Sequence, residues 1–144
     1  MANAIPANAN TRTRGDDRLM EIPTAGYAVF RARVIAAWRY LAIIDSDGRE
    51  ICRLDAATDT RITVTETPIA TRVAYEVRLR GDDPEFSTIL PVRIAGSAIY
   101  LVSTGGEPVS RVTVPVGTLT EATDGIIHTH TALLPERPVS EVST

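Results

Sequence analysis

The sequence predicts an all-β protein, an antiparallel β-sandwich or barrel of about eight or nine strands with extended N- and C-terminal arms. Three observations lead to this expectation. Apolar and polar residues alternate with a period of two through the middle of the chain, clusters of Gly, Asp and Pro separate these stretches, and both ends are too polar to form a core. A chain of 144 residues fits one domain that needs neither a disulfide nor a metal to fold.

The alternating stretches divide the domain into strands. The clearest runs from Thr71 to Arg80, where Val73, Tyr75, Val77 and Leu79 alternate with charged residues. Further strands are predicted around Cys52 and at 61–65, 86–94, 99–102, 111–116 and 126–134. Because Pro115 cannot donate a ladder hydrogen bond, the strand that contains it is expected at a sheet edge or at a strand end.

The segment from Tyr27 to Ile44 is ambiguous. It is rich in Ala and Arg, as helices are, but its arginines Arg31, Arg33 and Arg39 all occupy odd positions and its apolar residues include every even one. On a helix these three arginines would scatter over more than half of the circumference. We therefore expect two strands, or one long bent strand, with a helix as the alternative.

The chain divides into an extended N-terminal arm (1–24), a β-sandwich domain (25–134) and an extended C-terminal tail (135–144). The arm has no hydrophobic period, and the tail contains Pro135 and Pro138, which exclude a helix. Because neither segment has enough apolar side chains to offset its ordering entropy, we expect both to lie on another molecule. Arg12, Arg14 and Arg18 are the predicted partner-binding residues, since guanidinium groups pair strongly with carboxylates.

Composition excludes several classes of function. All 15 basic residues are arginines and the net charge is −3, which argues against a generally basic nucleic-acid binder. No apolar run is long enough for a membrane span, and no secretion signal is visible. The single cysteine excludes an internal disulfide and a multi-cysteine zinc site. We therefore expect no nucleic-acid or membrane partner and no cofactor.

Both histidines of the protein lie in the sequence His128-Thr129-His130. On a strand the two imidazoles share one face and could hold a metal together. Catalytic zinc sites usually need three protein ligands, and the sequence places no third ligand beside them. We therefore expect two polar, outward-facing residues, with Ile127 and Leu133 on the opposite face, and no metal ligand.

Other motifs favour structural roles. Asp45-Ser46-Asp47-Gly48 begins like a calcium loop, but its glycine comes too early, and a hairpin turn explains it better. Cys52 fits a small buried residue. Trp38 and Tyr40 could form part of the core or a small ligand patch. No nucleophile elbow or phosphate-binding glycine loop occurs, so no catalytic residue is predicted and we expect a non-enzymatic protein.

Four stretches give the chain a resemblance to known proteins: YLAIIDSDGREI at 40–51, YEVRLRGDDP at 75–84, LPV at 90–92 and TDGII at 123–127. Together, within residues 27–134, they resemble small β-sandwich virion proteins of tailed phages that infect GC-rich bacteria. The resemblance implies a capsid decoration (cement) protein that stabilises the shell through its β-domain and N-terminal arm. A small tail or head-tail component is the alternative.

The resemblance also implies partners and a location. The partners would be other virion proteins, the major capsid protein first, and the protein would form a homo-oligomer, with a trimer favoured. It would be made in the bacterial host cytoplasm and reside on the capsid surface of the virion. A different class of function, a ligand- or sugar-binding β-module with a metal at His128 and His130, remains open from the residues alone.

Overall fold

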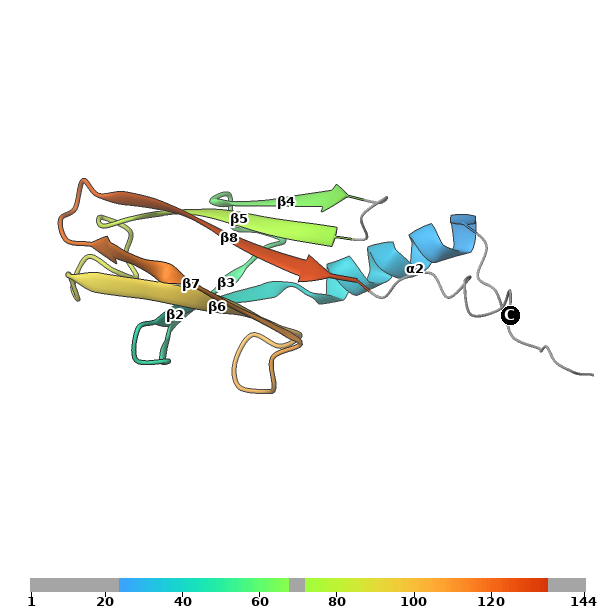
Figure 1. Ribbon diagram of the computed structural model, residues 1–144, viewed down its shortest axis with the longest axis horizontal. Coiled ribbons are helices and arrows are strands. Elements are labelled where there is room, and N and C mark those ends of the chain that lie inside the picture. Colours follow the sequence, from blue (N-terminus) through green and yellow to red (C-terminus); the bar gives the residue numbers. More distant parts are fainter. Residues whose placement is uncertain (1–23, 68–71, 135–144) are drawn as a thin grey trace, which may run out of the picture. The chain divides into compact units, whose positions relative to one another are not determined.

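The computed structural model describes residues 24–67 and 72–134, and these residues form two antiparallel β-sheets and one α-helix (Figure 1). The predicted all-β sandwich is confirmed. The elements are α2 (Thr24–Ala37), β2 (Tyr40–Asp45), β3 (Glu50–Asp55), β4 (Ile62–Thr67), β5 (Arg72–Arg80), β6 (Val92–Tyr100), β7 (Ser110–Leu119) and β8 (Gly125–Leu133). The expectations for the N-terminal arm, with Arg12, Arg14 and Arg18, and for the C-terminal tail concern segments outside the described residues.

Two sheets make up the sandwich. The first has four strands in the order β3-β2-β6-β7, and the second has three in the order β4-β5-β8. Hairpins join β2 to β3, β4 to β5, and β6 to β7, whereas the other connections carry the chain from one sheet to the other. β7 lies at a sheet edge, as Pro115 predicts.

The core fills the space between the sheets. Alternation along β5 buries Val73, Tyr75, Val77 and Leu79, each at most 1% exposed. Their neighbours from the other sheet include Leu41, Ile43, Ile94 and Ile99. In β5 every second residue points inward, so the apolar residues of the alternating pattern form this core.

The segment 27–44 is mostly helical, so the expectation of strands before residue 38 is wrong. α2 ends at Ala37 and β2 follows at Tyr40. The side chains of α2 that are buried or half-buried are Tyr27, Arg31, Val34 and Ile35, which share one helical face. Arg31 is only 8% exposed, so a charged residue is among the buried positions of this face and conceals the helical period. Among the described residues, no helix is long and apolar enough to cross a membrane.

The contacts divide the chain within α2. Residues 24–31 belong to one unit, in which the Arg31 guanidinium lies 5.4 Å from the centre of the Tyr27 ring. The sandwich unit begins at Ala32, so the predicted domain start at residue 25 precedes it. Within this second unit, Val34, Ile35 and Trp38 pack against the core.

Two predicted strands at 86–94 and 99–102 are one strand, β6, with different ends. Phe86 is fully buried but lies in the turns before β6, and Leu101 and Val102 lie in the loop after it. The middle of β6 contains Gly96, where an added Cβ would collide with the Val112 carbonyl oxygen on β7. Apolar content alone therefore does not give the limits of the strand, because Leu101 and Val102 are apolar, exposed and outside it.

Candidate functional site

A histidine–serine chain runs through the core between the sheets. β8 contributes His128 and His130, β6 contributes Ser97, and β7 contributes Ser110. Ser97 Oγ lies 2.7 Å from His128 Nε2 and 2.7 Å from His130 Nδ1, and Ser110 Oγ lies 2.8 Å from His130 Nε2. The Tyr75 ring packs edge-on against His130, with the ring centres 6.4 Å apart. The four polar side chains thus link three strands of the two sheets.

Burial keeps both imidazoles neutral. His128 and His130 are 4% and 0% exposed. Removal from water lowers the pKa of His128 below 6.5, and it lowers the pKa of His130 to about 4, with a smaller contribution from the neighbouring His128. A neutral imidazole has one donor and one acceptor nitrogen, and a serine hydroxyl can donate and accept, so the uncharged chain satisfies its internal hydrogen bonds.

The prediction that the histidines face outward is wrong. Ile127 and Leu133 are the exposed residues, at 58% and 69%, while His128 and His130 point into the core. The alternation along the strand predicts that the two apolar residues and the two histidines lie on opposite faces. It does not say which face is inside. The missing signal was the pair of serines on other strands, whose hydroxyls make histidine burial tolerable.

The geometry does not provide the metal site considered from the sequence. Both ring nitrogens of His130 already contact serine hydroxyls. Among the residues that the structure describes, no three His, Cys, Asp or Glu side chains gather as a metal would require. Ser97 beside two imidazoles resembles a nucleophile with its base, but it is only 2% exposed.

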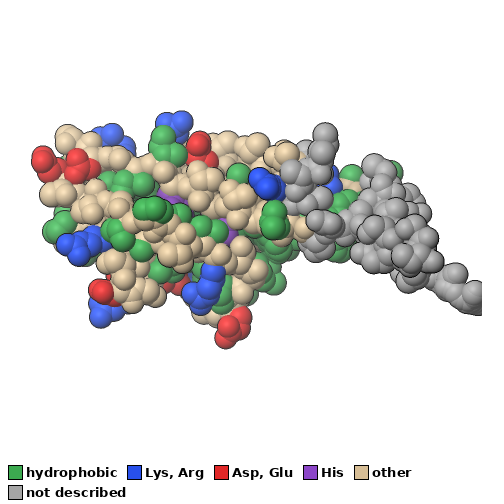
Figure 2. Space-filling view, in the orientation of Figure 1, with side chains coloured by type: hydrophobic (Ala, Val, Ile, Leu, Met, Phe, Trp, Pro, Cys, Tyr) green, Lys and Arg blue, Asp and Glu red, His purple; other side chains and the backbone are tan. Residues whose placement is uncertain are grey.

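The His128 end of the histidine–serine chain borders a hollow between β7 and β8. Its lining includes Ile94, Val114 and Ile126 as well as His128. Figure 2 shows parts of the histidine side chains (purple) in the middle of this face, among green apolar and tan atoms. His128 Nδ1 has no protein partner in the described part of the chain and is not one of its buried unpaired atoms, so it faces solvent here. The hollow therefore combines apolar side chains with two polar ones, His128 and Thr129.

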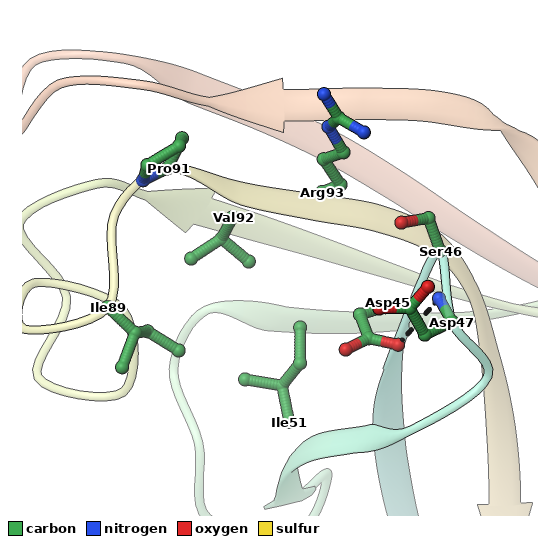
Figure 3. Close-up of a pocket in the computed structure, with 8 residues that line it drawn as sticks. All are labelled: Asp45, Ser46, Asp47, Ile51, Ile89, Pro91, Val92 and Arg93. Carbon is green, nitrogen blue, oxygen red and sulfur yellow. Dashed lines mark hydrogen bonds between the residues drawn. The ribbon is translucent and has the colours of Figure 1, made fainter.

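The turn at 45–48 is a hairpin turn, as predicted. The Asp45 carboxylate accepts hydrogen bonds from the amides of Asp47 and Arg49, and Gly48 has a φ of 83°. The turn borders another hollow, with Ile51 and Val92 across from the two aspartates (Figure 3). Because Asp45 already closes the turn, calcium is not needed to shape it.

Cys52 lies on β3 and is partly buried against the core. Burial raises the pKa of its thiol to about 12, and the negative charge of Glu85 adds to this effect. The thiolate that a nucleophile or a metal ligand requires is therefore strongly disfavoured. This position agrees with the expected role of a small core residue.

Trp38 and Tyr40, considered above as part of the core or as a small ligand patch, pack in different clusters. Trp38 follows α2 and packs against the main core, and its carbonyl accepts a hydrogen bond from the Tyr75 hydroxyl. Tyr40 packs in a second cluster with Ala42 and Ala98. The two aromatic rings therefore belong to different clusters and do not make a joint ligand patch.

Arg53 lies on the second face of the four-stranded sheet with its side chain largely buried, and no pattern in the sequence predicts this. Arg53 of β3 lies opposite Ala42, which in turn lies opposite Ala98. These small residues allow the Arg53 side chain to lie over the sheet, with its guanidinium carbon 3.6 Å from the centre of the Tyr100 ring. Only 7% of the Arg53 side chain is exposed.

Arg53 fixes the loop between β6 and β7, residues 101–109, which we call the pinned loop. Its Nη1 donates to the carbonyls of Val102 and Gly105 at 2.9 and 2.8 Å, and its Nε and Nη2 donate to Glu50. The loop presents Leu101, Val102 and Val109 to solvent, 40–51% exposed. An apolar surface on a firmly held loop is typical of a protein-binding site.

Comparisons with known proteins give no support to the resemblance seen in the sequence. No protein-family model, no curated protein and no solved structure matches the chain.

Proposed function

We propose that the protein is a non-enzymatic structural component of a phage particle, a capsid decoration protein that binds the major capsid protein and stabilises the shell. The proposal joins the sequence resemblance to one structural observation, the pinned loop. Leu101, Val102 and Val109 expose apolar surface, and Arg53 holds the backbone beneath them. A preformed apolar loop binds a partner without a large loss of conformational entropy.

The interior of the sandwich supports the same proposal. The histidine–serine chain is buried and joins the two sheets through its hydrogen bonds, and the Cys52 thiol is held in its protonated form. These groups stabilise a rigid body and are poorly placed for turnover. In the proposed complex, the rigid body contacts the shell through the pinned loop, and Arg12, Arg14 and Arg18 of the N-terminal arm pair with carboxylates of neighbouring subunits. Because the protein binds the assembled shell, binding raises the resistance of the shell to heat by mass action.

The test uses shells assembled from the major capsid protein of the phage whose genome carries the gene under this proposal. Purified full-length protein is added to undecorated shells, and occupancy is measured after the shells are pelleted. We expect saturable binding that the double substitution Leu101→Asp and Val102→Asp reduces at least tenfold, about 1.4 kcal/mol or more. Deletion of residues 2–24 should reduce occupancy independently.

Ile89 provides a matched control. It is 51% exposed, as is Leu101, but it lies in the turns before β6. Ile89→Asp should leave shell occupancy unchanged. Absence of binding by the wild-type protein contradicts the proposed decoration function, and equal losses from the Ile89 and Leu101/Val102 variants contradict the assignment of the pinned loop.

A further inference from the structure

β8 forms an open edge of the three-stranded sheet. It pairs with β5 along its whole length, from Arg72 opposite Leu133 to Arg80 opposite Gly125, without a bulge. The strand order β4-β5-β8 leaves the other side of β8 without a neighbouring strand among the described residues. β8 crosses the front of Figure 1, and the same view in Figure 2 shows apolar side chains on this face. A long, regular edge of this kind can pair with another strand.

The other three edge strands carry features that discourage such pairing. Natural proteins block sheet edges with charged residues, prolines and bulges. The blocking residues are Glu50, Arg53 and Asp55 in β3, Glu66 in β4, and Arg111 and Pro115 in β7. β8 has the sequence GIIHTHTAL, which contains no charge and no proline. Among the described edges, β8 is therefore the one best suited to pair with a further strand.

The sequence of β8 also indicates which strand would fit. Read from Ile126 to Leu134, IIHTHTALL has nearly the same order of residue classes in both directions around His130. If two copies ran antiparallel about a two-fold axis at His130, Ile127 would lie opposite the partner's Leu133. Thr129 would lie opposite the partner's Thr131. Aliphatic pairs and threonine pairs are favourable across antiparallel strands, and no like charges would meet.

We propose that two copies of the chain associate through β8, antiparallel about this axis, and join their three-stranded sheets into one continuous sheet. The most exposed large apolar residues of β8, Ile127 at 58% and Leu133 at 69%, then gain cross-strand neighbours. A two-fold interface uses the same surface on both copies, which the near-palindromic strand provides. This inference does not depend on the decoration function, and it differs from the trimer that the family resemblance implies.

The first test measures the mass of the full-length protein by light scattering and sedimentation at increasing concentration. We expect twice the chain mass of 15.5 kDa. Thr129→Lys combined with Thr131→Lys puts like charges opposite each other and should return the mass to that of one chain. The matched control is Thr63→Lys with Thr65→Lys, on the exposed face of the other edge strand, β4, which should leave the two-chain mass unchanged.

A second measurement tests the register and does not depend on the folding of the lysine variant. In a Cys52→Ser background, Ile127→Cys and Leu133→Cys proteins are prepared separately and then mixed under mild oxidation. Because the two positions face each other across the proposed axis, the mixture should form a disulfide-linked pair much faster than either protein alone. A wild-type mass of one or three chains overturns the proposal, as does dissociation by the β4 control or equal cross-linking in all three samples.

Discussion

Ser97 Oγ lies 2.7 Å from both His128 Nε2 and His130 Nδ1, so one hydroxyl group on β6 joins two imidazoles on β8. The two strands belong to different sheets. A polar link of this kind inside an apolar core is stabilising only while each member keeps its partners and its charge state. This dependence makes the stability of the sandwich sensitive to pH and to the loss of a single hydroxyl.

Acidification should destabilise the sandwich before its carboxylates titrate fully. Both histidines have a pKa below 6.5 in the folded state, about 4 for His130, whereas in the unfolded chain they titrate near 6.5. The unfolded state therefore binds more protons below pH 6.5, and stability that is complete above this pH is lost as the pH falls towards 4. His130 alone should account for a loss of up to about 3 kcal/mol. Urea unfolding between pH 7.5 and 4.5 measures it.

A histidine-free variant separates this effect from other titrations. His128→Asn combined with His130→Asn should be less stable than wild type at pH 7.5, because the buried hydrogen bonds change. Its stability should nevertheless fall less between pH 6.5 and 4.5. Parallel pH curves for the two proteins would show that the histidines do not control the acid response.

Loss of the Ser97 hydroxyl should be costly despite the small change in volume. Ser97→Ala removes two hydrogen bonds and leaves the facing nitrogens of His128 and His130 without their common partner. We expect a decrease of about 1–3 kcal/mol in the free energy of unfolding at pH 7.5. Ser46→Ala, in an exposed turn, is the control and should change it by less than about 0.5 kcal/mol. Equal effects of the two substitutions would argue against a stabilising role for the chain.

Arg53→Lys should loosen the pinned loop while the charge is retained. A lysine ammonium cannot donate to Glu50 and to the carbonyls of Val102 and Gly105 in the same planar arrangement, nor can it stack as a guanidinium does on a tyrosine ring. Amide hydrogen exchange across 101–109 should become faster, and stability should fall by about 1–2 kcal/mol. Arg93→Lys, at an exposed position of β6, should leave this exchange unchanged.

Arg61→Met should destabilise the protein more at neutral pH than in acid. Arg61 contacts the carboxylates of Asp59, Asp83 and Glu85 at 2.7, 3.1 and 2.9 Å. Its hydrogen bonds lower the pKa of Asp59 and of Glu85, so the stabilisation is present above the ordinary carboxyl pKa values and is lost as these groups are protonated.

We expect the Arg61→Met difference from wild type to be about 1–2 kcal/mol at pH 7 and to shrink near pH 3. Arg78→Met, at an exposed position on β5, is the control and should show a much smaller difference at both pH values. A difference for Arg61→Met that stays constant with pH would exclude the charge network as its cause. Thermal unfolding at a series of pH values provides the measurement.

The strands that could be predicted are those in which period and environment agree. In β5, charged residues face solvent and apolar residues face the core, so the pattern gives both the strand and its inner face. β6 lacks this contrast because Ala98 and Tyr100 are buried on the outer face as well. α2 could not be predicted because buried Arg31 interrupts the apolar face that identifies a helix.

The candidate sites were only partly accessible from sequence. The sequence marks His128 and His130 as a pair, but their orientation depends on hydroxyl groups 20 to 33 residues away in the chain. Arg53 gave no signal because, besides Glu50, its partners are the pinned loop and Tyr100 of β6, which only the fold brings to it. Polar groups satisfied by distant partners are the least predictable part of a single sequence.

The histidine–serine chain also links His128 on β8 to Ser110 on β7 through side chains alone. Because Ser97 has one proton, donation to His130 requires that it accept from His128, and donation to His128 requires the reverse. If His128 Nδ1 donates to an acceptor in the hollow beside β7, His128 Nε2 must accept from Ser97, and Ser97 must then accept from His130 Nδ1. His130 Nε2 is in that state an acceptor, so the Ser110 hydroxyl must donate to it, with no movement of the main chain.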